Sequence, residues 1–461
     1  MNHTAMERKR PTVESSARRQ ILTALLATIP TFTYGIQIGW LSPTRLHLKA
    51  AGVTDSDISW LAAALPLAAI CGIPFFTYSS DRFGRKICII TVSLLSCISW
   101  TIKLATLSAP LLIVARAIAG VAAAGCFVVV PVYVKEIAED SWRGALASLT
   151  MTVCKLGVIF VYGLGTWLPY THNQAVYLTV AIVHALAFCF MPESPNYLLK
   201  RGREKKATQT IAWLRSLNRG ETSVLDEVHK LKDEHRRFDE MPRVTLCSII
   251  RDRATFSALR VTLMLMALQT LSGCFALMNY ASEVFARAGS VWDPNLLTLL
   301  MGFLQLAGSF FTTVSIEKFG RKIPLACSCA VVSLCMIALA TYFLTHAGPR
   351  WLPVVSVCLC LLSYGAGLAP VPMVVMAEVF TYQMRARMAG ASMAFSFFCS
   401  SMTVLFYTPT ASAFGVHVVF YVFAAVTAWG VLYTALWVPE TRGKSLQEIR
   451  EYWVKPEPVH V

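Results

Sequence analysis

Charged residues are scarce in this chain. Asp, Glu, Lys and Arg make up 15% of its 461 residues, whereas hydrophobic residues make up 56% and the mean hydropathy is +0.56. About a quarter of the residues of a soluble domain are charged, so the composition excludes that class. The net charge of +15 does not indicate a nucleic-acid partner, because the basic residues stand between apolar runs, as orientation signals of membrane proteins do. We therefore predict a lipid bilayer, and no nucleic acid, as a partner.

Features that would indicate other functions are missing. The chain has no cleavable signal peptide, since Met1–Gln20 is polar and basic and the apolar run from Ile21 is long enough to span a membrane. It has no phosphate-binding loop and no group of nucleophile, base and oxyanion donors, which excludes enzymes and ATPases. Its 14 cysteines lie mostly within apolar runs, where they act as small hydrophobic residues. We expect no cofactor, no metal site and no disulfide framework.

Apolar runs of membrane-spanning length alternate with short polar segments. Six lie on each side of one long polar segment, at about Ile21–Leu41, Ile58–Tyr78, Ile87–Thr106, Leu111–Val134, Ala145–Leu168 and Ala175–Met191, then Phe256–Tyr280, Asn295–Ser315, Ile323–Thr345, Trp351–Ala377, Met388–Tyr407 and Val416–Val438. The pattern predicts an all-α membrane protein with twelve transmembrane helices. Its parts are an N-terminal tail (1–20), a six-helix bundle (21–192), a linker with short helices (193–255), a second six-helix bundle (256–438) and a C-terminal tail (439–461).

Lys and Arg indicate the orientation of these helices. They are concentrated in alternate loops, at Arg8-Lys9-Arg10, Arg82/Arg85/Lys86, Lys135/Arg143, Arg321/Lys322, Arg385/Arg387 and Arg442/Lys444. The other loops contain little beyond Arg45, Lys49, Arg287 and Arg350. Because basic loops stay in the cytoplasm, we predict that both termini are cytoplasmic. We also expect a plasma-membrane protein that functions as a monomer.

A charged hexapeptide occurs twice. Asp81-Arg82-Phe83-Gly84-Arg85-Lys86 returns 236 positions later (317 minus 81) as Glu317-Lys318-Phe319-Gly320-Arg321-Lys322. Each copy has an acid, a base, Phe, Gly and two bases in the same order between two apolar runs. The Gly allows a tight turn that residues with a Cβ resist. The repeat indicates two homologous halves, which is the usual construction of secondary transporters.

The hexapeptides belong to a series of motifs that runs from the first span to the C-terminal tail. The series also comprises Gly39-Trp40-Leu41-Ser42-Pro43, Arg116-x-x-x-Gly120, Pro131–Ile137 with Arg143-Gly144, Pro192–Pro195, Gln269-x-x-Ser272-Gly273, Pro370-x-Pro372, Ala377-Glu378 and Pro439–Gly443. In this order and spacing the motifs resemble the sugar porters of the major facilitator superfamily, of the facilitative glucose transporter type and most of all the insect trehalose-transporter branch. The resemblance implies the major facilitator fold, with two six-helix bundles around a central cavity, and transport of a sugar such as trehalose or a hexose by alternating access.

The resemblance also implies an inner gate of charged residues. In sugar porters such groups pair across the two halves and hold the cytoplasmic side shut in the outward-open state. The matching residues are Asp81, Arg82, Arg85, Arg116, Glu136, Arg143, Glu317, Arg321, Glu378 and Arg385. Isolated surface charges at helix ends would contribute little. Arg116 and Glu378, however, adjoin apolar spans where an unpaired charge is costly, so we expect a gate.

The substrate-binding positions that the resemblance implies differ from the family pattern. They are Met151, Lys155, Gln269, Thr270, Phe275, Asn279, Met373, Ser396 and Phe397. Gln269 keeps the family's residue, whereas Thr270 and Met151 each replace a Gln, Phe275 an Asn and Met373 a Trp, and Ser396-Phe397 stands for Asn-Trp. Asn279 falls where the family has an aromatic pair. Because a sugar needs hydrogen-bond partners and a ring face, we expect Gln269 to be the main contact, assisted by Thr270, Asn279 and Ser396, with Phe275 and Phe397 against the ring.

Two lysines lie inside predicted spans. Lys155 is one helical turn from Met151 on the same face of the fifth span. A Lys at this depth is costly unless it faces water or a partner, so it either lines the cavity, where it contacts substrate or a gating acid, or snorkels or pairs with the backbone. Lys103 lies nearer the outer end of its helix, and we expect it to snorkel.

The first span contains no acid. Between Ile21 and Leu41 there is no Asp or Glu, and Ile36 stands about where proton-coupled relatives carry an acid. A proton relay needs a titratable group in the path, so the sequence favours facilitated diffusion, a uniport mechanism. Two alternatives stay open, namely a sugar sensor of the same fold that does not transport, and a transporter of a different polyol or small polar solute.

Overall fold

The structure is a computed structural model that describes residues 13–139, 141–240, 252–289, 292–345 and 348–454. Within these ranges every regular element is a helix, as the sequence predicted. Eleven of the continuous or broken helices are long and apolar enough to cross a membrane. The twelfth, α8 (Tyr170–Phe188), begins with polar residues but packs against α1 and α4 within the same bundle.

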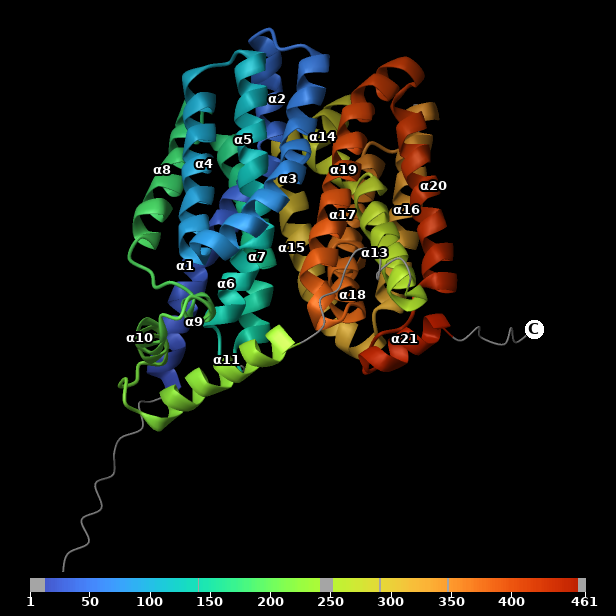
Figure 1. The fold of residues 1–461 in the computed structure, drawn as a ribbon. Coiled ribbons are helices and arrows are strands. Elements are labelled where there is room, and N and C mark those ends of the chain that lie inside the picture. The colour runs from blue at the N-terminus through green and yellow to red at the C-terminus, as the bar shows by residue number, and fades with distance from the viewer. Residues whose placement is uncertain (1–12, 140, 241–251, 290–291, 346–347, 455–461) are drawn as a thin grey trace, which may run out of the picture.

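Six membrane-crossing units, five candidate spans and α8, form the N-terminal half, and Figure 1 shows their arrangement. They are α1 (Val13–Gly39) followed by α2 (Leu41–Ala50), α3 (Asp55–Phe83), α4 (Arg85–Ala105), α5 (Ala109–Val128) continued by α6 (Val130–Ile137), α7 (Arg143–Trp167) and α8. Small residues bring α1 and α7 into backbone contact. A Cβ on Gly35 would lie 1.9 Å from the carbonyl oxygen of Cys154, and one on Gly157 would lie 2.1 Å from that of Phe32. This contact turns the Cys154 side of α7 toward α1.

The C-terminal half repeats this plan. Its units are α13 (Arg253–Leu271) with α14 (Cys274–Arg287), α15 (Pro294–Phe319), α16 (Lys322–Thr345), α17 (Leu352–Ser363) with the π-helix η1 (Tyr364–Leu368) and α18 (Val371–Val379), α19 (Tyr382–Phe414) and α20 (Val416–Trp437). The two halves meet along the pairs α3–α19 and α7–α15. Breaks at Gly273 and before Pro370 interrupt two of the units, and membrane helices tolerate such breaks where a neighbour takes up the freed backbone groups.

Three short helices lie beneath the N-terminal half: α9 (Pro195–Lys200), α10 (Glu204–Arg215) and α11 (Thr222–Glu240). They bury a small apolar cluster of Ile211, Ala212, Val224 and Val228. Leu225, next to Val224 in α11, is 42% exposed and does not join the cluster. Arg215 fixes the group to the N-terminal half by donating to the carbonyl oxygen of Ile137 at 3.1 Å.

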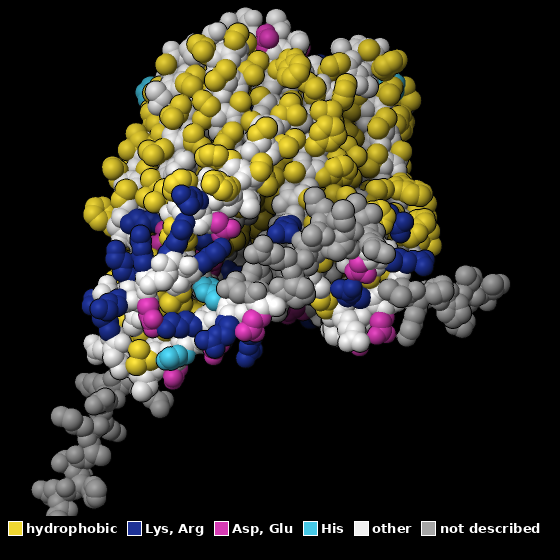
Figure 2. Space-filling view, in the orientation of Figure 1, with side chains coloured by type: hydrophobic (Ala, Val, Ile, Leu, Met, Phe, Trp, Pro, Cys, Tyr) yellow, Lys and Arg dark blue, Asp and Glu magenta, His cyan; other side chains and the backbone are white. Residues whose placement is uncertain are grey.

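Basic side chains gather at one end of the molecule, the end where α9–α11 lie, while the rest of the visible surface is largely apolar (Figure 2). We call this end the basic end. The start of α1 and the last helix, α21 (Leu446–Val454), both lie there. An ion pair of 2.8 Å between Arg450 and Asp252 joins α21 to the start of α13.

Candidate substrate path and gates

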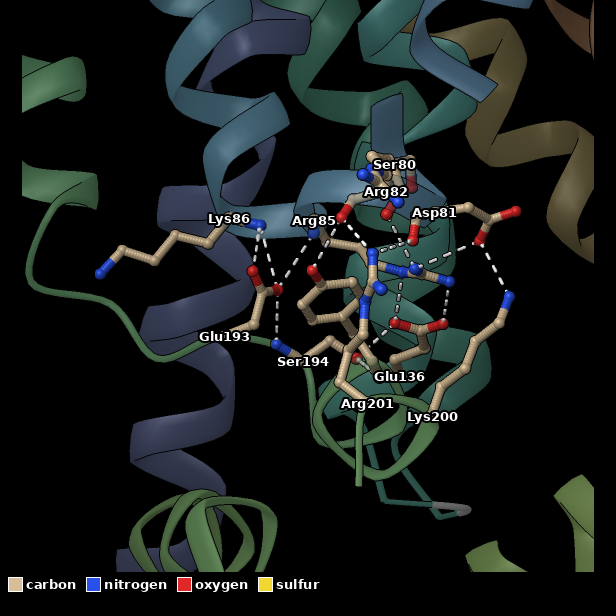
Figure 3. A network of polar contacts seen from close by, with 11 residues as sticks. Ser80, Asp81, Arg82, Arg85, Lys86, Glu136, Glu193, Ser194, Lys200 and Arg201 are labelled. Carbon is tan, nitrogen blue, oxygen red and sulfur yellow. Dashed lines mark hydrogen bonds and ion pairs between the residues drawn. The ribbon is translucent and has the colours of Figure 1, made fainter. Parts of the chain in front are cut away.

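The turn between α3 and α4 forms a charged cluster at the basic end, the N-corner, made of Asp81, Arg85, Glu136 and Glu193 (Figure 3). Arg85 Nε and Nη2 donate to the two carboxylate oxygens of Glu136, each at 3.1 Å. Both side chains are only 11% exposed. Asp81 adds a longer ion pair of 3.5 Å to the same guanidinium. Such fork-shaped pairs are the strong and geometrically specific ones, so the N-corner fixes α6 against the α3–α4 turn.

Glu193 caps the start of α4. Its carboxylate accepts the backbone N–H groups of Arg85 and Lys86 at 3.1 Å and that of Ser194 at 2.8 Å. The N–H groups of Arg85 and Lys86 lie in the first turn of α4, where they have no partner inside the helix. Gly84 has a φ of +100°, and a Cβ there would lie 2.2 Å from Glu193 Oε2, so the hexapeptide requires its glycine. Burial raises the pKa of Glu193, although the three backbone hydrogen bonds oppose the rise.

The second hexapeptide builds the same arrangement, the C-corner, from Arg321, Glu378, Glu440 and Thr441. Arg321 again forks onto a carboxylate, with Nε–Oε2 and Nη2–Oε1 distances of 3.1 and 2.5 Å to Glu378. Glu440 accepts the backbone N–H groups of Arg321 at 2.9 Å and Lys322 at 3.1 Å. Burial raises the pKa of Glu440, but backbone hydrogen bonds, first from Arg321, lower it by more, so the pKa lies below its usual value. The two copies of the hexapeptide therefore form the same contacts, a forked Arg–Glu pair and a glutamate that caps the next helix.

The predicted gate residues pair differently from the expectation. Glu136 and Glu378 bind Arg85 and Arg321 of their own halves, not partners across the interface. Asp81 and Glu317 are exposed, and the backbone carbonyl of Arg82 accepts a hydrogen bond from the linker residue Tyr197 at 3.2 Å. Arg143 begins α7 at the same end, and Arg385 donates to Phe380 in its own half at 3.4 Å. The expectation concerned the outward-open state, and this structure is closed at the opposite end.

Contacts across the halves close that opposite end. Arg45 of α2 forms a 2.8 Å ion pair with Glu283 of α14, and its guanidinium lies 5.0 Å from the ring centroid of Tyr280. Ser282 Oγ donates to the carbonyl oxygen of Ser42 at 2.8 Å. Ser42 belongs to the Gly39–Pro43 motif, so a sequence signal marked this contact, whereas Glu283 had none. We call this set the outer gate.

Arg116 was predicted to belong to the inner gate, and this position is wrong. Arg116 lies in α5, is 1% exposed, and donates to the backbone carbonyls of Leu61 at 2.9 Å and of Gln37. It is two turns from the start of α5, which is the end away from the basic end. Its guanidinium therefore ties α5 to α1 and α3 in the outer part of the bundle. The Arg-x-x-x-Gly motif indicated a charged residue in this span but not how deep in the bundle it lies.

Lys103 does not snorkel. It is fully buried, its ammonium donates to Gln37 Oε1, and it lies 4.2 and 4.1 Å from the ring centroids of Trp40 and Trp100. Aromatic faces attract cations most strongly when both are desolvated. The two rings and the amide take the place of an acidic partner.

The predicted substrate residues are distributed over both sides of the interface. They lie on α7 (Met151 and Lys155), α13 (Gln269 and Thr270), α14 (Phe275 and Asn279), α18 (Met373) and α19 (Ser396 and Phe397). Gln269 is 8% exposed and its Nε2 donates to the carbonyl oxygen of Ala369, at the break before α18, at 2.7 Å. Thr270 donates to the carbonyl of Met266 in its own helix at 3.0 Å. Met151 is 41% exposed.

Asn279 has a spare acceptor. Its Nδ2 donates to the carbonyl of Phe275 at 2.9 Å, while its Oδ1 is buried and has no hydrogen-bond partner among the described residues. A buried carbonyl oxygen without a partner is rare and costs free energy. Ser396 is buried at 9% exposure, and Phe275 and Met373 are partly buried against the core.

Three aromatic rings cross the interface, and sequence reasoning missed two of them. Phe397 of α19 packs edge-on against Phe127 of α5, with centroids 5.7 Å apart, and Phe127 packs in the same way against Tyr34 of α1 at 5.1 Å. Only Phe397 stood at a motif position. Tyr34 and Phe127 lie within apolar runs, where nothing in the sequence separates a core aromatic from one at the interface. We call these three residues the aromatic bridge.

Two homologous six-helix halves with duplicated charged corners, joined by a closed gate at one end, define a membrane transporter of the alternating-access kind. Comparison with known proteins gives the family. The sequence profile described as "Sugar (and other) transporter" matches residues 4–453. The chain belongs to this family.

Among its relatives, the facilitated trehalose transporter Tret1 of Culex quinquefasciatus is 26% identical over 93% of this chain and 85% of its own length. The Tret1-2 homologue of Drosophila simulans is 26% identical over 95% and 92%. The chain spans about half of the Anopheles gambiae Tret1, 55% of its length.

Solved structures show the same fold. The partially occluded inward-open xylose transporter XylE from E. coli aligns with a TM-score of 0.79 at 19% identity, over 92% of this chain and 99% of that one. Its inward-open form aligns with a TM-score of 0.78 at 20% identity, over 94% of this chain and all of that one. These similarities establish the major facilitator fold, with twelve membrane-crossing units as the sequence predicted.

Proposed function

We propose that this protein is a facilitative sugar transporter, a uniporter that moves a sugar such as trehalose or a hexose across the plasma membrane. The observation that carries the proposal is the division of contacts between the two ends. Contacts across the halves close the outer gate, while the charged corners at the other end pair within their halves. A transporter that alternates access needs gates that form and break between rigid halves. The names of the trehalose transporters above support a sugar as the substrate.

The uniport mechanism rests on the absence of a relay. Between Arg18 and Gly39, α1 contains no Asp or Glu, and Ile36 is fully buried. Two buried bases contact α1. Arg116 is held by backbone carbonyls and Lys103 by the Gln37 amide, and neither is held by a carboxylate. A proton that crosses with substrate needs a titratable group that binds and releases it, and the membrane-spanning part of α1, Arg18–Gly39, contains no carboxylate for this role.

The gathering of Lys and Arg supports the orientation. Basic segments are retained in the cytoplasm, so we assign the basic end, with the start of α1 and helix α21, to the cytoplasmic side. The outer gate then faces the outside, and the structure corresponds to an inward-facing state.

Uptake in an expressing cell line tests the proposal. We expect radiolabelled trehalose or a hexose to equilibrate across the plasma membrane without accumulating, and a protonophore to leave the rate unchanged. Surface abundance is measured in parallel. Accumulation that the protonophore abolishes would show proton coupling, and full surface abundance without uptake of any sugar would favour a sensor.

A further inference from the structure

We propose that Lys155 gives the transporter a preference for negatively charged solutes. A sugar acid would then be bound and transported in preference to the neutral sugar that has the same ring. The inference rests on the proposed function and narrows its substrate class. It would make Lys155 a specificity-determining residue, with its ammonium against the carboxylate of the solute. Five observations carry it: the depth of Lys155, its direction, the aromatic rings at its level, its lack of a partner among the described residues and the charge of the surrounding half.

Lys155 lies at the middle of its membrane span. Helix α7 runs from Arg143 to Trp167, so Lys155 is 12 residues from either end (155 minus 143, and 167 minus 155). At about 1.5 Å per residue this is roughly 18 Å along the axis. A lysine side chain is far shorter than that distance, so the ammonium cannot reach either membrane surface by snorkelling.

The face of α7 that carries Lys155 turns toward the interface between the halves. Cys154, Gly157 and Val158 contact α1. About a quarter-turn around the helix, Tyr162 donates its hydroxyl to the carbonyl of Met278 in α14 at 2.8 Å. Lys155 and Tyr162 are seven residues apart and therefore share a face. Ile159, between them, contacts Gly302 of α15.

The level of Lys155 is also that of the aromatic bridge. Gly35 of α1 touches the carbonyl of Cys154, and its neighbour Tyr34 begins the row of rings that crosses to Phe397. A solute at this level can place its ring against aromatic faces and a charged group toward α7. Partly apolar walls with a few placed polar groups are what small-molecule sites consist of.

Lys155 has no partner in the described part of the chain. It is partly buried, and no hydrogen bond or ion pair joins its ammonium to a described residue. Three acids at the ends of the membrane helices already have basic partners. Glu136 pairs with Arg85, Glu378 with Arg321, and Glu283 with Arg45. A lysine in the membrane interior without a partner is costly, so its presence indicates a partner that arrives from solution.

The surrounding half is positively charged inside. Every buried charged residue in the described ranges is basic: Arg45, Lys103, Arg116 and Arg215. Lys103 and Arg116 lie in the interior of the N-terminal bundle with only π faces, amides and carbonyls as partners. Both are buried and line no cleft, so they act through the electrostatic potential of the bundle, which a positive charge without an acidic partner raises. This potential favours anions over cations near Lys155.

The test compares D-glucuronate with D-glucose, which have the same ring and differ in the carboxylate. Radiolabelled uptake and binding to the purified protein in detergent are measured for the wild type, Lys155→Met and Lys155→Arg. We expect the wild type to prefer glucuronate, Lys155→Met to lower the glucuronate-to-glucose ratio about tenfold or more, and Lys155→Arg to keep most of it. Because Lys155 has no partner among the described residues, Lys155→Met should unfold at the same temperature as the wild type or higher, which separates lost binding from lost folding.

Equal ratios in the wild type and in Lys155→Met would overturn the inference even if both sugars are transported. If no sugar enters cells but purified wild type binds glucuronate more tightly than glucose and Lys155→Met does not, the inference holds and the proposed transport function fails. A marked loss of thermal stability in Lys155→Met with an unchanged binding ratio would show a structural lysine and overturn the inference.

Discussion

The two halves of the molecule share their charged corners but not their interiors. Arg85 with Glu136 and Arg321 with Glu378 make the same forked pair, and Glu193 and Glu440 cap equivalent helices. Inside the bundles the resemblance ends. The N-terminal half buries Lys103 and Arg116, whereas the C-terminal half has no buried cation in its described spans and offers the amides of Gln269, Asn279 and Gln305 instead.

This difference separates two kinds of requirement. The corners hold helix ends in a rigid half, a task that is the same on both sides of a two-fold transporter, so both copies keep the same residues. The interior surfaces of the two bundles face the same substrate path, and each contacts a different part of the solute. We infer that the C-terminal wall contributes hydrogen bonds through amides and that the N-terminal wall contributes charge.

The largest effect is expected from breaking the corners. Glu136→Gln leaves the guanidinium of Arg85 without its forked partner where both side chains are 11% exposed, and losing one member of a buried pair costs about 3–5 kcal/mol. Glu378→Gln should cost less, about 1–3 kcal/mol, because Glu378 is 28% exposed and solvent screens the remaining charge. Thermal unfolding of the purified variants in detergent measures both.

Asp81→Asn is the matched control for the N-corner. Asp81 is the 59% exposed second partner of Arg85, at 3.5 Å, so its loss should change stability by less than about 0.5 kcal/mol.

If Glu378→Gln destabilised the protein as much as Glu136→Gln, the two corners would be energetically equal in spite of their different exposure.

The outer gate gives the next largest effect. Glu283→Gln removes the acid that forms an ion pair with Arg45 across the halves, while Asp55 remains bonded to Arg45 at 3.0 Å. We expect a cost of about 1.5–3 kcal/mol, below the usual cost of breaking a buried pair. The outward-open population should rise about tenfold or more. The measurement is the labelling rate of a Ser282→Cys variant by a membrane-impermeant thiol reagent added outside. Arg287→Gln is the control, since Arg287 binds the other oxygen of Glu283 within α14 and is 51% exposed. Similar labelling in both variants would contradict the assignment of the gate.

The sequence allowed the fold to be predicted more completely than the site, and particular residues show why. Helix number and halves follow from apolar length and from a repeated hexapeptide, which are local properties. The partner of Glu136 is not local, because Arg85 lies 51 positions earlier in the chain. Depth is not local either: Arg116 was assigned to the wrong end, and Lys103 was expected at a surface that it does not reach. Tyr34 and Phe127 differ from core aromatics only in what packs against them.

Gln269→Ala tests the amide wall of the C-terminal half. Gln269 already donates Nε2 to Ala369, so we expect only its carbonyl oxygen to accept from the substrate, at a loss of about 1–3 kcal/mol, or roughly tenfold in affinity. The Michaelis constant and the surface abundance are measured together. Thr270→Val is the control, because the Thr270 hydroxyl bonds within its own helix. An unchanged constant with reduced abundance would show that Gln269 serves the α13–α18 contact alone.

The smallest effect concerns the two capping glutamates, whose pKa values move in opposite directions. The pKa of Glu440 is lowered by its backbone donors in spite of burial, whereas burial raises the pKa of Glu193. A lowered pKa means that the ionised Glu440 stabilises the folded protein above the usual glutamate pKa, and that this stabilisation is lost as the pH falls through the folded value. For Glu193 the sign is reversed: its contribution is present below the usual pKa and is lost as the pH rises through the raised value.

Glu440→Gln and Glu193→Gln should therefore differ most near neutral pH. We expect Glu440→Gln to cost about 0.3–1 kcal/mol there, the usual worth of an anion at a helix N-terminus, and the cost to shrink as the pH falls below about 4. Glu193→Gln should cost less at neutral pH, because the wild-type protein holds a carboxylate there against burial. Unfolding midpoints in detergent between about pH 2 and pH 7 compare the two variants with the wild type. Parallel pH profiles for both variants would mean that the corners are electrostatically alike, and the difference between the halves would then be confined to the interior of the bundles.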